Sequence, residues 1–284
     1  MIEKKKEFRL IQKKNTPASL LPNALTILGV CLGLSSIKFA LDSNYQMAVI
    51  TIGLAAILDT LDGRVARLVN ATSKVGKELD SLTDVISFGV APSFIMYFWS
   101  VNEIGKLGWL FVLVYTVCCA LRLARFNLTN IDENESWKIN FFEGVPSPAA
   151  AGLVLLPLIL SLSNIIEFLN LEAIISFLNL NNIFTIENNK IISSIIIIST
   201  SILMVSKIPT YSLKRITIPR KSGGFLLLGI GTYISLLIFF TFEILFLTGL
   251  IYILLIPVSY FHHKYLSKKF LNENIEEEEI EDIL

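Results

Sequence analysis

The sequence predicts an all-α polytopic membrane protein with about eight transmembrane helices of ~20 residues each. Three observations support this prediction. Hydrophobic residues make up 53% of the 284 residues, and charged residues only 17%. The mean hydropathy is +0.65, well into the range of integral membrane proteins. Finally, the lysines and arginines gather in every second connection between the apolar runs, which is the pattern of a chain that crosses a bilayer repeatedly.

The first half of the chain contains four of the expected spans. A basic segment, residues 1–18, comes before them and is expected to anchor the first span on the cytoplasmic side. Pro22 begins the first span, where its missing N–H is tolerated. Pro92 lies within the third span and predicts an irregular helix there. The four spans are expected at about 20–41, 47–69, 77–99 and 107–121.

The second half contains the other four spans, so that one transmembrane domain covers residues 19–265. Residues 164–190 are Asn-rich and amphipathic, and we expect an outer loop with an interfacial helix. Residues 266–284 are acidic and predict a disordered tail. Three cysteines lie in apolar runs and show no metal-ligand spacing. The four spans are expected at about 149–162, 191–205, 224–240 and 243–260.

The distribution of basic residues predicts the orientation of the chain. Of the 24 lysines and arginines, 21 lie in the two termini or in alternate connections, and only Lys38, Lys106 and Lys190 lie elsewhere. Because basic residues concentrate on the cytoplasmic side, both termini and the connection between the second and third spans are expected there. The net charge of zero gives no indication of a nucleic-acid partner.

Four aspartates within 26 residues are the main functional signal: Asp59, Asp62, Asp80 and Asp84. An ionised carboxylate in mid-bilayer costs ~2.5–3.5 kcal/mol, so four of them require compensation. Asp59 and Asp62 are three apart on one expected helix, and Asp80 and Asp84 are four apart on the next, so each pair lies on one helix face. If the two helices pack antiparallel through residues 70–74, the two acidic faces converge.

Converging carboxylates repel one another unless cations lie among them. Oxygen ligands suit Mg²⁺, Mn²⁺ or Ca²⁺, and the absence of Cys and His from the cluster argues against zinc. Gly63 and Ala66 leave room for a phosphate group beside the aspartates, and Arg67 can make a forked contact to it. Two alternatives are a salt-bridged helix pair without function and a cation transporter that uses the acids as a transit site.

The pattern Asp59-x2-Asp62-Gly63-x2-Ala66-Arg67-x8-Gly76-x3-Asp80-x3-Asp84 resembles the signature of the CDP-alcohol phosphotransferase family without a departure. The resemblance implies a six-helix core, here with two additional C-terminal helices, and a homodimer. It implies transfer from a CDP-linked lipid to an alcohol with release of CMP. It also implies two divalent cations, Mg²⁺ or Mn²⁺, one on Asp59, Asp62 and Asp80 and the second on Asp59, Asp80 and Asp84. Asp84 would take the proton of the acceptor hydroxyl.

The same resemblance implies which residues contact the CDP-lipid. Asn23 and Thr26 in the first span would meet the nucleotide, although both could simply cap that helix. The full set of expected CDP-lipid contacts is Asn23, Thr26, Gly63, Arg67, Ser73 and Gly76.

Four further segments resemble the bacterial membrane-bound phosphatidylserine synthases of this family: 87–92, 120–127, 144–150 and 206–212. This resemblance implies CDP-diacylglycerol as donor, L-serine as acceptor, and a place in the bacterial inner membrane with the site facing the cytoplasm. Serine carries a carboxylate, so Arg122 and Arg125 are expected to bind it. The alternatives are that both arginines are membrane-edge anchors, and that the acceptor is glycerol 3-phosphate, inositol phosphate or choline.

Overall fold

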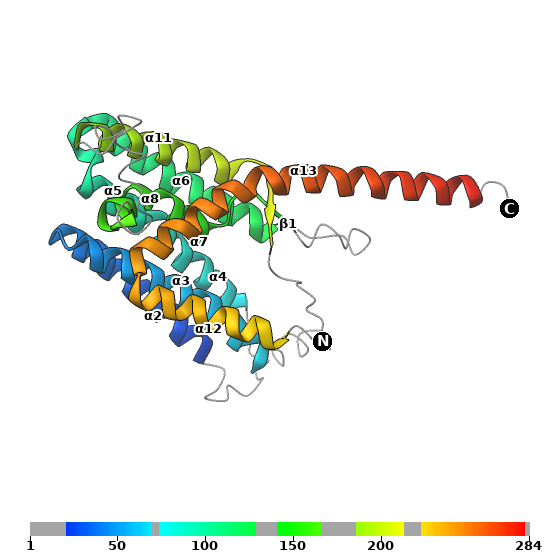
Figure 1. Ribbon diagram of the computed structural model, residues 1–284, viewed down its shortest axis with the longest axis horizontal. Helices are drawn as coiled ribbons and strands as arrows, with labels where there is room; N and C mark the ends of the chain where they lie inside the picture. Colours follow the sequence, from blue (N-terminus) through cyan, green and yellow to red (C-terminus); the bar gives the residue numbers. More distant parts are fainter. Residues whose placement is uncertain (1–20, 70–73, 129–140, 166–185, 213–222, 282–284) are drawn as a thin grey trace, which may run out of the picture. The chain divides into compact units, whose positions relative to one another are not determined.

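The computed structural model describes residues 21–69, 74–128, 141–165, 186–212 and 223–281, which are almost entirely helical (Figure 1). The chain divides into two compact units, Met1–Ile95 and Met96–Leu284. Of the segments singled out in the sequence, residues 1–18, most of 164–190 and part of the connection after the sixth span lie outside the described residues.

In its described residues, the first unit contains three helices and a π-helical turn ahead of α5 (Ala91–Trp99). These are α2 (Leu21–Leu41), α3 (Tyr45–Leu68), α4 (Lys74–Asp84) and the turn η3 (Val85–Val90). Helix α5 follows and continues into the second unit. The remaining elements are η4 (Val101–Ile104), α6 (Lys106–Leu128), β1 (Phe141–Glu143), α7 (Ser147–Val154), α8 (Leu156–Leu162), α11 (Ile186–Val205), β2 (Pro209–Tyr211), α12 (Gly223–Phe239) and α13 (Thr241–Glu281).

The helices confirm the prediction of an all-α polytopic membrane protein. Within the described ranges, four segments are long and apolar enough to cross a membrane: Leu21–Leu41, Val75–Trp99, Lys106–Leu128 and Thr241–Lys268. Two shorter apolar helices are Asn189–Val205 and Gly223–Phe239. The two other expected spans are also helical. One is α3, which bears the charged residues of the aspartate motif, and the other is interrupted at Leu155 between α7 and α8.

Helix α2 is the packing centre of the first unit. Its buried residues recur every three or four positions, which places them on one face. This face packs against α3 and also against α4 and η3. Small residues allow helices to approach closely, as is usual in membrane proteins. The buried residues of α2 are Pro22, Thr26, Gly29, Gly33, Ser36 and Ala40.

The third expected span is irregular, but over Val85–Val90 rather than at Pro92. There the backbone makes a π-helical turn, and the N–H of Ala91 bonds to the carbonyl of Ile86. Pro92 lies in the first turn of α5, where its lack of an N–H matters least. The wide turn begins directly after Asp84, and π-turns of this kind are frequent at functional sites.

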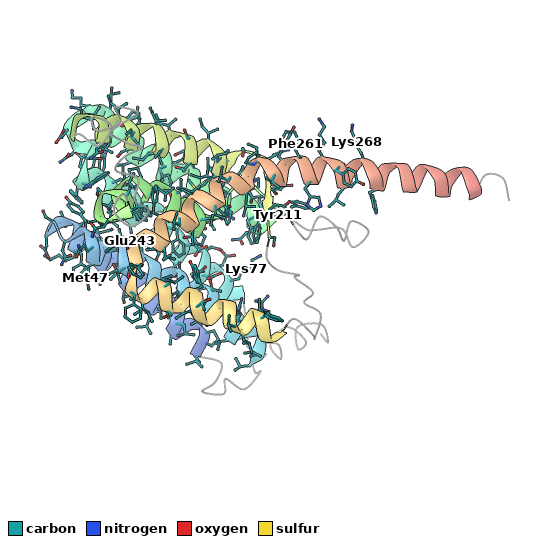
Figure 2. The ribbon with its side chains drawn as sticks, in the orientation of Figure 1. Met47, Lys77, Tyr211, Glu243, Phe261 and Lys268 are labelled. Atoms are coloured by element: carbon teal, nitrogen blue, oxygen red, sulfur yellow. The ribbon has the colours of Figure 1, made fainter. Side chains whose placement is uncertain are left out.

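The second unit packs α6 beside α11 and joins distant segments through a two-stranded sheet (Figure 1). Strands β1 and β2 are antiparallel, with Phe141 opposite Tyr211. Tyr211 is labelled in Figure 2, and its hydroxyl oxygen lies 3.0 Å from Nδ1 of His262 on α13. Its ring stacks on Phe141 with 5.6 Å between the ring centroids. These contacts tie β2 to α13.

Helix α13 is longer than expected. It continues to Glu281, whereas residues 266–284 were predicted to be a disordered acidic tail. The helix thus extends over most of the segment for which the sequence predicts disorder, and the disorder of this tail stays a prediction. Glutamate is a good helix former, and extending an existing helix avoids the cost of nucleating a new one.

Candidate active site

Three aspartates from two helices come together in the first unit. Asp59 and Asp62 lie in the second half of α3, and Asp80 lies in α4. One carboxylate oxygen from each can be chosen so that all three lie within 4.8 Å of one another. The convergence of the two acidic faces expected from the sequence is therefore observed.

The burial and mutual repulsion of these carboxylates favour the binding of a cation. Asp62 is only 4% exposed, and Asp59 and Asp80 are half-buried. Two carboxylates ~5 Å apart repel by roughly 3 kcal/mol at an effective dielectric constant of about 20. All the ligand atoms offered are carboxylate oxygens, which is the donor set preferred by hard divalent cations. The residues present thus fit a Mg²⁺ or Mn²⁺ ion.

The fourth aspartate belongs to the same region. Asp84 is the last residue of α4 and is half-buried. Its carboxyl group lies within hydrogen-bonding reach of the Asp59 carboxyl. Since Asp59 also belongs to the three-aspartate cluster, it links Asp84 to the other two acids.

Thr26 contacts the cluster directly. Its hydroxyl is 2.7 Å from Oδ2 of Asp62 and 3.0 Å from the carbonyl oxygen of Pro22, and its side chain is 5% exposed. Sequence reasoning expected Thr26 to meet the CDP-lipid and did not anticipate its contact with Asp62. The signal available in the sequence was the recurrence of small residues on the face of α2 that carries Thr26.

The other residues expected at the CDP-lipid differ in their exposure. Asn23 is half-buried in the first turn of α2, and Gly76 is half-buried in α4. Gly63 is exposed, and a Cβ built there would meet no atom within 4 Å, so the space beside the aspartates is open. Arg67 is exposed near the end of α3. Ser73 lies outside the described residues.

The two arginines expected to bind serine lie in the second unit and have different surroundings. Arg122 is 7% exposed; its Nη1 donates to Oγ of Ser147 at 3.1 Å, and its guanidinium carbon lies 6.0 Å from the centroid of the Phe126 ring. Arg125 donates from Nη1 to the carbonyl of Val205 at 2.8 Å and from Nη2 to the carbonyl of Ser206 at 3.2 Å. It thereby satisfies carbonyls at the C-terminal end of α11.

These contacts bring together three of the four segments that suggested a serine acceptor. Arg122 joins segment 120–127 to Ser147, and Arg125 joins it to Ser206. The hydroxyl of Thr210 donates to the carbonyl of Gly144 at 2.7 Å, which ties segments 144–150 and 206–212 together. Gly144 has a φ of 73°, and a Cβ there would lie 2.7 Å from the carbonyl oxygen of Met204, so glycine is required at this turn.

Comparison with known proteins identifies the family of the chain. The model of the CDP-alcohol phosphatidyltransferase family matches residues 19–261. The CDP-diacylglycerol–serine O-phosphatidyltransferase of Mycobacterium leprae is 46% identical over 144 residues, which are 50% of this chain and 48% of that protein. The Helicobacter pylori protein of the same name is 46% identical over 145 residues, which are 51% of this chain and 59% of that protein.

The protein of this name from Bacillus subtilis is 38% identical over 130 residues, which are 46% of this chain and 70% of that protein. This chain spans about half the length of the mycobacterial relative that it matches. The family match, by contrast, extends over most of the chain, from the first span to the second half of α13, and includes all four aspartates. The chain belongs to the CDP-alcohol phosphatidyltransferase family.

Proposed function

We propose that the protein transfers the phosphatidyl group of CDP-diacylglycerol to the hydroxyl of L-serine and releases phosphatidylserine and CMP. The observation that carries this proposal is the convergence of Asp59, Asp62 and Asp80 within 4.8 Å, between helices of a chain that belongs to this family. The names of the relatives from Mycobacterium, Helicobacter and Bacillus support serine as the acceptor.

The aspartates would hold two divalent cations. The family depends on divalent metal ions in general, and the carboxylate cluster fits Mg²⁺ or Mn²⁺. Asp59, Asp62 and Asp80 would bind one ion, and Asp59, Asp80 and Asp84 the second. When bound, such ions screen the charge of the diphosphate and stabilise the phosphoryl group during transfer.

The reaction needs a base and an oriented donor. Asp84 takes the proton from the serine hydroxyl, and the serine oxygen forms a bond to the phosphorus that carries the diacylglycerol. The bond between this phosphorus and the oxygen of CMP breaks, and CMP leaves. Arg67 binds the diphosphate, and the open space at Gly63 lets the phosphates approach α3. We assign Asn23, Thr26, Ser73 and Gly76 to the surroundings of the donor.

The serine carboxylate is assigned to the Arg122–Arg125 pair. A guanidinium binds a carboxylate through two parallel N–H donors, and it does so more strongly when it is withdrawn from water. Arg122 is the stronger candidate of the two because it is buried and its guanidinium donates to the side chain of Ser147. Arg125, in contrast, donates to the backbone carbonyls of Val205 and Ser206 at the end of α11.

The protein is placed in a bacterial inner membrane in this proposal. The resemblance to bacterial membrane-bound phosphatidylserine synthases favours the bacterial inner membrane. The asymmetry of lysine and arginine favours an orientation with both termini and the aspartates on the cytoplasmic side. There CDP-diacylglycerol is supplied by the membrane and serine by the cytoplasm. We also propose a homodimer, following the resemblance to the family.

The first prediction tests the reaction itself. The purified full-length protein, with CDP-diacylglycerol and Mg²⁺ in mixed micelles, is expected to release CMP with L-serine and not with glycerol 3-phosphate, inositol phosphate or choline. A chelator should abolish the release, and Asp84→Asn should slow it by ~10²-fold or more because the proton acceptor is lost. CMP and radiolabelled phosphatidylserine are the two readouts.

The possible results separate the alternatives. If CMP were released with another alcohol, the proposed reaction type would stand, but the acceptor would be that alcohol and not serine. Metal flux into protein-containing vesicles without CMP release would favour a cation transporter and would contradict the proposal.

The second prediction concerns the acceptor. Arg122→Lys is expected to raise the KM for serine by ~10-fold or more, because one ammonium group cannot reproduce a two-pronged contact. The KM for CDP-diacylglycerol and the affinity for Mn²⁺ should stay near wild type. Arg125→Lys is also expected to raise the KM for serine, by less than Arg122→Lys, and to lower the thermal midpoint, since Arg125 holds the end of α11. An unchanged KM for serine in both variants would remove the arginines from the serine site.

A further inference from the structure

Helix α2 supplies no carboxylate to the aspartate cluster, yet one of its side chains touches it. The Thr26 hydroxyl lies 2.7 Å from Oδ2 of Asp62, a residue on α3 that is 36 positions away. Both side chains are more than nine-tenths buried, at 5% and 4% exposure. The contact therefore joins two helices in a region from which water is largely excluded.

The Thr26 hydroxyl has one hydrogen and two acceptors. The carbonyl of Pro22 lies at 3.0 Å, and the Asp62 carboxylate is closer at 2.7 Å. Hydrogen bonds to charged groups are shorter and roughly twice as strong as neutral ones, so the hydrogen points to Asp62. The Pro22 carbonyl is within the same helix, where it can accept from the backbone.

We propose that Thr26 is a positioning residue that holds Asp62 in the orientation needed to bind a divalent cation. The inference rests on the proposed metal site and adds a residue outside the carboxylates to it. Thr26 holds Oδ2, while lone pairs of the carboxylate remain for the cation that Asp59 and Asp80 also face. Partners that orient metal ligands in this way typically change metal affinity ~10–100-fold when removed.

This role differs from a contact between Thr26 and the CDP-lipid. A lipid contact predicts that loss of the hydroxyl raises the KM for CDP-diacylglycerol and leaves metal binding intact. A positioning role predicts that metal affinity falls even when no lipid substrate is present. The two roles can therefore be separated in the substrate-free protein.

The third prediction is that Thr26→Val weakens Mn²⁺ binding by ~10-fold or more in the full-length protein without substrate. Free Mn²⁺ is measured by electron paramagnetic resonance during titration of the protein in detergent. Valine keeps the branched shape of threonine and replaces its hydroxyl, and with it the hydrogen bond to Asp62, by a methyl group. Thr26→Ser retains a hydroxyl and is expected to bind Mn²⁺ within about threefold of wild type. If the valine variant does not fold, Thr26→Ala repeats the test without the methyl group that valine puts in place of the hydroxyl.

Thr51→Val is the matched control. Thr51 is also buried, at 6% exposure, but among the described residues its hydroxyl bonds to the carbonyls of Met47 and Ala48 within its own helix. It should bind Mn²⁺ as the wild type does. Equal Mn²⁺ affinity in Thr26→Val and wild type would overturn the inference, and so would equal losses in Thr26→Ser and Thr26→Val. A wild type that binds no Mn²⁺ would overturn the metal site itself.

Discussion

Asp80→Asn is expected to reduce serine-dependent CMP release by at least ~10³-fold, equivalent to about 4 kcal/mol of transition-state stabilisation. Asp80 is the only member of the three-aspartate cluster that α4 contributes, and in the proposal it contacts both cations. An amide keeps the size of the side chain but loses the charge that attracts a divalent ion. Mn²⁺ affinity and the rate of CMP release should therefore fall together.

The control for this variant is Asp42→Asn. Asp42 lies between α2 and α3 and is exposed, and its carboxylate forms a salt bridge with Lys38. Exposed pairs of this kind contribute ~0–1 kcal/mol, so the variant should bind Mn²⁺ and release CMP as the wild type does. Normal CMP release by folded Asp80→Asn would rule out the assignment of the cluster as the metal site. Circular dichroism of the helices verifies that the variant is folded.

Much of the fold was predictable because helix periodicity acts within a single segment. Long apolar runs with basic flanks predict spans, and the helices agree with the expected ranges to within a few residues, apart from the C-terminal extensions of α6 and α13. The convergence of Asp59, Asp62 and Asp80 was predictable for a similar reason. The spacing assigns each acid to a helix face, and burial of uncompensated carboxylates is so costly that both faces are expected to converge on a shared cation.

The contacts between helices were less predictable, because they depend on how far apart two axes lie and on how they are rotated. The Thr26–Asp62 hydrogen bond and the hydrogen bond from Ser87 in η3 to the carbonyl of Gly29 in α2 are of this kind. Arg122 and Arg125 look equivalent in the sequence, three residues apart on one helix, yet one holds a side-chain hydroxyl and the other two backbone carbonyls. These partners come from segments far away in the chain.

Gly33→Ala is expected to destabilise the protein by about 1–3 kcal/mol, the usual effect of overfilling a tightly packed contact. A Cβ at Gly33 would lie 2.6 Å from Oγ, 2.9 Å from Cα and 3.1 Å from Cβ of Ser87 in η3. The Ser87 hydroxyl can rotate away, but its backbone cannot move without shifting the turn that follows Asp84. The thermal unfolding midpoint and the Mn²⁺ affinity should therefore both decrease.

Gly53→Ala isolates the cause, because Gly53 lies within α3 and a Cβ there would meet no atom within 4 Å. Both substitutions gain the same ~1 kcal/mol of helix propensity over glycine, so a difference between them reports packing alone. Adding Ser87→Ala to Gly33→Ala should recover only part of the loss, since the contacts with Cα and Cβ of Ser87 remain. If Gly33→Ala were as stable as Gly53→Ala, α2 would not be pressed against η3, and another contact would have to hold Asp84 beside Asp59.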